Sequence, residues 1–72
     1  MVEPIEQGAI KVIEIIGVSI EGFDDAVQQA VSKASQSING ITGVEVVKTA
    51  ASVKDGKITQ YTATVKLAFV VR

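Results

Sequence analysis

The C-terminal segment, residues 42–72, limits the possible folds of this chain more than any other stretch. Its two arms read GVEVVKTAASV and ITQYTATVKLAFVVR, and they are joined by KDGK. Asp55-Gly56 inside this joint is typical of a tight hairpin turn, because the favoured turns need positive φ angles at their centre. The segment therefore predicts a long β-hairpin.

The second arm of the hairpin alternates between two kinds of side chain, as a strand with two different faces does. One set is mostly apolar and is predicted to face the core: Tyr61, Ala63, Val65, Leu67, Phe69 and Val71. The other set begins polar and becomes apolar towards its end: Gln60, Thr62, Thr64, Lys66, Ala68 and Val70. One face of this strand is therefore predicted to be buried.

The length of the second arm predicts association between copies of the chain. About 15 residues at roughly 3.3 Å each make a strand about 50 Å long. A compact chain of 72 residues has a radius of gyration of about 11 Å, equivalent to a sphere roughly 29 Å across. Either the strand bends sharply or neighbouring subunits cover the excess, and we favour the second.

The composition supports the same conclusion. A chain this short buries only about 60% of its unfolded surface, and small domains commonly add disulfides, a structural metal or oligomerisation. Cys and His are both absent, while 47% of the residues are hydrophobic. Disulfides and the common zinc sites are excluded, which leaves subunit association.

Charge and hydropathy exclude several classes of partner. The net charge is −1 and the seven basic residues are scattered, so no basic patch exists for nucleic acid or an anionic membrane. No apolar run approaches the roughly 20 residues of a membrane span. The acidic start, MVEPIEQG, does not fit a secretory signal. We therefore expect a cytoplasmic protein.

The chain is predicted to be a single domain, residues 1–72, with residues 1–8 as a loose or disordered lead-in. A strand rich in β-branched residues is predicted over residues 9–16. Ile residues occupy both of its faces, so both faces are predicted to be at least partly covered. Gly17 begins the segment that is predicted to leave this strand.

A helix is predicted over about residues 22–38, because apolar residues recur there at three- and four-residue spacing. Gly40 suits the left-handed position behind its last turn. The element order is β-α-β-β. It predicts an α+β fold with a three-stranded sheet in the order 1-3-2, the last strand antiparallel to both neighbours, and the helix on one face.

Two groups of carboxylates could serve as metal ligands. Glu14 stands among apolar strand residues. It is either an edge-facing or salt-bridged carboxylate, or it lines an intersubunit channel or ion site. Glu21, Asp24 and Asp25 crowd the predicted helix N-terminus, where the helix dipole favours negative charge. The alternative is a divalent-cation site, although the regular oxygen spacing of a calcium loop is absent.

The sequence offers little for catalysis. The absence of His and Cys removes the usual general base and the thiol nucleophile. The serines have no evident activating partner and fit turn, cap or exposed helix positions: Ser19, Ser32, Ser35, Ser37 and Ser52. We therefore expect a protein that is not an enzyme.

Four segments of the sequence resemble the dodecin family. They are KVIEIIGVS near the start, DDAVQQAVSKAS in the predicted helix, EVV after the link and TVKLAF near the end. The resemblance runs over about residues 11–71. It implies a small β-α-β-β protein that assembles into a hollow homododecamer, binds a flavin such as riboflavin or FMN, and stores or buffers it.

The resemblance also implies a set of cofactor-binding positions: Gly43, Glu45, Gln60 and Thr62. The family's flavin-stacking Trp falls on Gly43, two residues before Glu45. The family's Gln that hydrogen-bonds the flavin pyrimidine edge falls on Thr62, and Gln60 on the same strand face substitutes only in part. The chain contains no Trp, and the loss of a stacking aromatic costs about 1–3 kcal/mol. We expect weak flavin binding or none.

Two functions therefore stay open. The first is a dodecin-like shell that stores a small ligand, by resemblance a flavin. The second is a flavin-less assembly that binds cations or is purely structural. Some family members that lack the Trp bind calcium, which makes Glu14, Asp24 and Asp25 the candidate metal ligands, with Glu45 as a further carboxylate.

Overall fold

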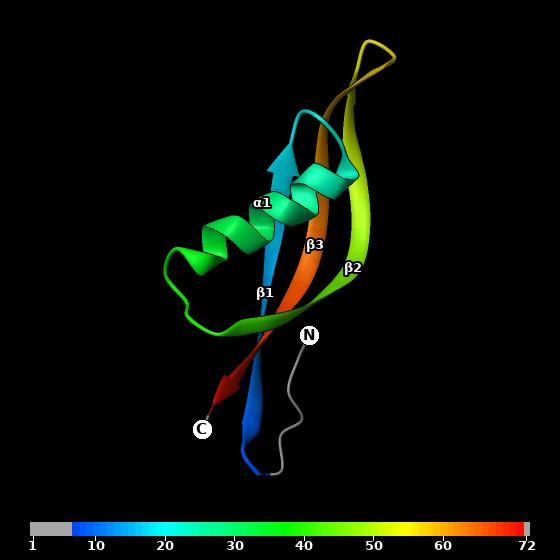
Figure 1. The fold of residues 1–72 in the computed structure, drawn as a ribbon. Helices are drawn as coiled ribbons and strands as arrows, with labels where there is room; N and C mark the ends of the chain where they lie inside the picture. Colours follow the sequence, from blue (N-terminus) through cyan, green and yellow to red (C-terminus); the bar gives the residue numbers. More distant parts are fainter. Residues whose placement is uncertain (1–6, 72) are drawn as a thin grey trace.

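The computed structural model describes residues 7–71 and contains four elements (Figure 1). They follow the order β1 (Ala9–Ser19), α1 (Phe23–Ser35), β2 (Ile41–Lys54) and β3 (Lys57–Val71). The strands form one sheet in the order β1-β3-β2, with β3 antiparallel to both neighbours. The predicted α+β fold and strand order are confirmed. Residues 1–6 of the predicted lead-in lie outside the described residues.

The turn between β2 and β3 has the predicted geometry. Asp55 has a φ of 53° and Gly56 a φ of 76°, and two successive positive angles are characteristic of a type I′ hairpin turn. Gly40, in the link between α1 and β2, also has a positive φ, of 80°. The prediction for the hairpin turn is therefore confirmed. The left-handed φ of Gly40 is confirmed as well, but α1 ends at Ser35, so the glycine does not stand directly behind the last turn.

The core lies between α1 and one face of the sheet. It consists of small or branched apolar residues from β3 and α1: Ala63, Val65, Leu67, Ala26, Ala30 and Ala34. The alanines let the helix lie close to the strands. Tyr61, on the same face of β3, packs edge-on against Phe23 of α1 with 4.9 Å between the ring centroids. The buried face predicted from the alternation of β3 is thus confirmed at Ala63, Val65 and Leu67, whereas Val71 at the strand end is 46% exposed.

The sheet extends well beyond the helix, as Figure 1 shows. The principal extents are 52 × 21 × 19 Å and the radius of gyration is 14.4 Å, whereas a compact chain of this length would have about 11 Å. Residues 44–60, which form most of β2, the turn and the start of β3, are all exposed. The predicted overhang of the hairpin is confirmed.

The first strand is longer than predicted. β1 continues to Ser19, and Gly17 pairs with Ala63 inside the sheet. A Cβ added to Gly17 would overlap the carbonyl oxygen of Ala26 and lie 2.9 Å from the Ala30 Cβ. The glycine therefore lets α1 contact the strand backbone, and the prediction that it begins the exit from the strand was wrong.

The helix is shorter than predicted. α1 ends at Ser35, and the next amides make tighter bonds: Gln36 N–H donates to the Lys33 carbonyl and Ser37 N–H to the Ala34 carbonyl. Three-residue spacing of this kind is common where a helix unwinds.

In the described part of the chain, no helix has the length and hydropathy needed to cross a membrane.

Candidate ligand site on the open sheet face

We call the side of the sheet that α1 does not cover the open face. Since strand residues alternate between faces, the even-numbered residues of β1 point to it. Four of them are large apolar side chains that are 45–62% exposed: Ile10, Val12, Ile16 and Val18. The sequence predicted that both faces of this strand would be at least partly covered, and in the single chain this face is not. An exposed apolar surface of this kind marks an interaction or ligand site.

Charged residues form one row across this face. Glu14 of β1 and Glu45 of β2 lie directly across from Lys66 of β3, one on each side. Cross-strand neighbours of this kind have Cβ atoms about 4.5–5.5 Å apart. Glu14 is exposed, and the register places it across from a lysine.

A hollow of about 250 Å³ lies next to the charged row. Part of its lining comes from the cross-strand row beside the charged one, in which Val12 and Gly43 lie across from Ala68. Six residues line it: Val12, Gly43, Val44, Glu45, Lys66 and Ala68. Two candidate cofactor-binding residues, Gly43 and Glu45, are therefore brought together. Sequence reasoning did not select Val12 or Lys66, because only the register reveals that they border the same hollow.

The other two candidates lie further along the open face. Thr62 is across from Ala50 and Gln60 is across from Ser52. Thr62 and Ala68 are six positions apart on β3, which corresponds to about 20 Å along a strand. Thr62 also uses its hydroxyl within the sheet, where Oγ1 donates to the Ala50 carbonyl oxygen at 3.2 Å. The four candidates share one face but form two separate regions in a single chain.

Gly43 leaves room for a side chain. A Cβ added to it would lie 3.7 Å from the Ala68 Cβ, an ordinary van der Waals contact. The glycine has no positive φ angle that would exclude other residues. A Cβ at Gly43 is therefore compatible with the fold, and a side chain there would extend over the open face.

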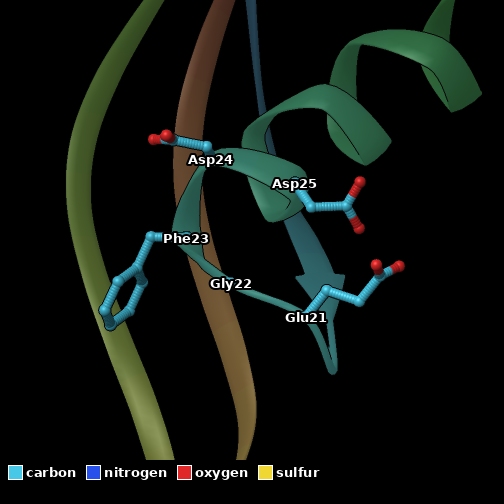
Figure 2. Close-up of a pocket in the computed structure, with 5 residues that line it drawn as sticks. All are labelled: Glu21, Gly22, Phe23, Asp24 and Asp25. Carbon is cyan, nitrogen blue, oxygen red and sulfur yellow. The ribbon is translucent and has the colours of Figure 1, made fainter.

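The N-terminus of α1 forms a second, acidic depression of about 420 Å³ (Figure 2). It is lined by Glu21, Gly22, Phe23, Asp24 and Asp25. Figure 2 shows the Asp24 carboxylate pointing away from those of Asp25 and Glu21. The acidic residues of the first turn have the position that the helix dipole favours.

Ser19 joins the end of β1 to this depression. Its hydroxyl donates to Asp25 Oδ2 at 2.7 Å and accepts a bond from the Glu21 N–H at 2.9 Å. Ser19 is nearly buried, with 7% of its surface exposed. The Ser19 hydroxyl thus links the end of β1 to the start of α1 through the Asp25 carboxylate and the Glu21 backbone amide.

The candidate metal ligands are not brought together. Glu14 points to the open face, whereas Asp24 and Asp25 belong to the helix on the other side of the sheet. Within residues 7–71, no group of three or more Asp, Glu, His or Cys side chains is arranged to hold a metal ion.

Comparisons with known proteins agree with this fold. The family model described as Dodecin matches residues 9–72. Dodecin from Streptomyces coelicolor has a TM-score of 0.90 and 29% identity, with 94% of this chain and 97% of that chain covered. Dodecin from Streptomyces davaonensis has a TM-score of 0.87 and 30% identity, with 93% and 98% covered. A search among curated proteins returned no match.

A third solved structure is of a dodecin named for an ion. It is the calcium dodecin of Mycobacterium tuberculosis, a calcium-chelating immunodominant antigen with a novel calcium-binding site. Its TM-score is 0.77 and its identity 32%, with 89% of this chain and 91% of that chain covered.

The fold defines a small β-α-β-β protein with one uncovered sheet face. The chain belongs to the dodecin family.

Proposed function

We propose that this chain is a self-assembling small-ligand binding and storage protein that forms a homododecameric shell and sequesters a flavin weakly. The observation that carries the proposal is the open face, where large apolar side chains of β1 lie exposed beside the hollow at Gly43 and Glu45. A binding role, with no catalysis, fits a chain without His or Cys.

The geometry of the candidates links binding to assembly. Gly43 and Thr62 lie about 20 Å apart along one chain, which is longer than a flavin ring system. One bound flavin that contacts both positions therefore needs Gly43 from one copy and Thr62 from another. Assembly would cover the apolar open face and complete the ligand site in the same step.

Replacing Gly43 by Trp is expected to create or strengthen riboflavin binding. A Cβ at this position makes only an ordinary contact with Ala68, and a stacking aromatic contributes about 1–3 kcal/mol, equivalent to roughly 5- to 150-fold in affinity. Quenching of riboflavin fluorescence in a titration measures the effect. The matched control is Gly22→Trp, which adds the same indole where nothing lies within 4 Å of the added Cβ. If Gly43→Trp binds no better than the unchanged protein, Gly43 is not the stacking position.

A second candidate function is cation binding in a dodecin-like assembly. The observation that favours it is the acidic depression at Glu21, Asp24 and Asp25, together with the likeness to a calcium dodecin. Isothermal titration with calcium tests it: heat of binding that disappears in Asp24→Asn would support a cation site at α1. Unchanged heat in that variant would remove Asp24 from the site.

A further inference from the structure

Thr64 is a buried hydroxyl residue at the centre of the open face. It lies on the central strand between Ile16 of β1 and Lys48 of β2, which are its direct cross-strand neighbours. Its sequence neighbours Ala63 and Val65 are fully buried against α1, so by alternation Thr64 points to the open face. Only 7% of the residue is exposed.

The hydrogen bonds of the sheet distinguish Thr64 from Thr62. The Thr62 hydroxyl donates to the Ala50 carbonyl oxygen at 3.2 Å. Among the described residues, no hydrogen bond involves the Thr64 hydroxyl. The described part of the chain also contains no fully buried side-chain oxygen or nitrogen without a partner, so the Thr64 oxygen can be reached from the open face. A hydroxyl that reaches the surface and has no partner within the fold is free to donate to a bound group.

The residues around Thr64 determine which chemical group of a ligand can hydrogen-bond there. Lys48 lies across from it, and Lys66 is two positions along the same face of β3. Lysine ammonium groups only donate hydrogen bonds, and the threonine hydroxyl can also donate. The two carboxylates nearest to this group, Glu14 and Glu45, lie across from Lys66 in the next row. The two cross-strand neighbours of Thr64, a lysine and an isoleucine, contribute no acceptor side chain.

We propose that Thr64, together with Lys48, binds an acceptor oxygen of the ligand on the open face. The resemblance to the family assigned the hydrogen-bonding role to Thr62, whose hydroxyl is already used within the sheet. This inference rests on the proposed function, because it places a ligand on the open face. The acceptor oxygen belongs either to a ring carbonyl or to a phosphate, and both have the same chemistry towards these donors.

Two matched variants test the hydroxyl in the ligand-free protein. Thr64→Val removes a hydroxyl that has no partner, so thermal unfolding should show an unchanged or higher midpoint temperature. Thr62→Val removes the donor to Ala50 and should lower the midpoint. If Thr64→Val lowers it as much as Thr62→Val does, the Thr64 hydroxyl has a partner within the fold and the proposal is wrong.

Binding of three probes tests the role towards a ligand. Equilibrium dialysis of the assembled protein against lumichrome, riboflavin and FMN should show affinity lowered by about two- to tenfold in Thr64→Val. Lys48→Gln should lower it as well, whereas Lys54→Gln, at the hairpin tip, should not. If Thr64→Val binds all three probes more weakly, the acceptor oxygen belongs to a ring carbonyl. If only FMN binds more weakly, the acceptor oxygen belongs to the phosphate.

The two proposals fail in different ways. If the unchanged protein binds flavin and Thr64→Val binds it equally well, the assignment of Thr64 is overturned while the proposed function stands. If the unchanged protein binds none of the three probes, the flavin proposal and the ligand role of Thr64 are both overturned. If Thr64→Val disperses the assembly, as judged by native mass, Thr64 contacts another copy and the ligand role is overturned.

Discussion

Replacing Gly17 by Ala is expected to destabilise the fold by about 3 kcal/mol or more, the upper end of overpacking effects. The added Cβ would overlap the Ala26 carbonyl oxygen and lie 2.9 Å from the Ala30 Cβ. The carbonyl belongs to the helix backbone, so a change of side-chain rotamer cannot relieve the overlap. The helix must move away from β1, and this movement would loosen the contact between α1 and the core. Urea denaturation of both proteins measures the difference.

The control for this substitution is Gly22→Ala. Gly22 precedes α1 in an extended conformation with a φ of 168°, and nothing lies within 4 Å of an added Cβ. The same chemical change at Gly22 should alter stability by less than about 1 kcal/mol. Equal effects at Gly17 and Gly22 would mean that α1 does not rest on the backbone of β1.

Replacing Leu67 by Ala is expected to cost about 2–5 kcal/mol, because it removes three carbons from a fully buried side chain. Leu67 is 0% exposed and is among the largest side chains of the core. It pairs with Ile13 on one side and with Val44 on the other, so the strands cannot close easily over the cavity. The free energy of unfolding in urea measures the loss.

The control for Leu67 is Ile58→Ala near the hairpin tip, where Ile58 is 54% exposed. Truncation there removes little buried surface in the single chain and should cost below about 1 kcal/mol. A cost below about 1 kcal/mol at Leu67 as well would mean that its face of β3 does not contact α1.

Local patterns were sufficient to predict most of the fold. The alternation of β3 identified its buried face, and Asp55-Gly56 identified the turn, because both signals depend only on neighbouring residues. The role of Gly17 could not be predicted in this way. A glycine after a run of β-branched residues is typical of a strand end, and neighbouring residues reveal neither its pairing with Ala63 nor the close approach of α1.

The candidate site was less predictable than the fold. The resemblance to the family placed Gly43 and Glu45 in one region, and the structure puts both beside one hollow. It also suggested Thr62 as the hydrogen-bonding residue, but the bond to Ala50 depends on the register between β2 and β3. That register contains shifts, including one between Val46 and Lys48, and sequence spacing alone does not reveal them.

The fold also places the candidate metal-binding carboxylates on opposite sides of the sheet. Glu14 lies on the open face, while Asp25 accepts a hydrogen bond from Ser19 at the N-terminus of α1. Composition gives the number of carboxylates, but their arrangement around an ion is a property of the packed structure. The cation hypothesis therefore depends on the acidic depression alone or on carboxylates contributed by another copy.

The central claim is that copies of this chain assemble and cover the open face. Native mass spectrometry of the purified protein at micromolar concentration tests it most directly. We predict a twelve-subunit mass, with flavin-sized increments appearing only when riboflavin or FMN is added in excess. A monomer mass under the same conditions would contradict the claim, because the exposed side chains of β1 and the overhanging hairpin would then have no partner.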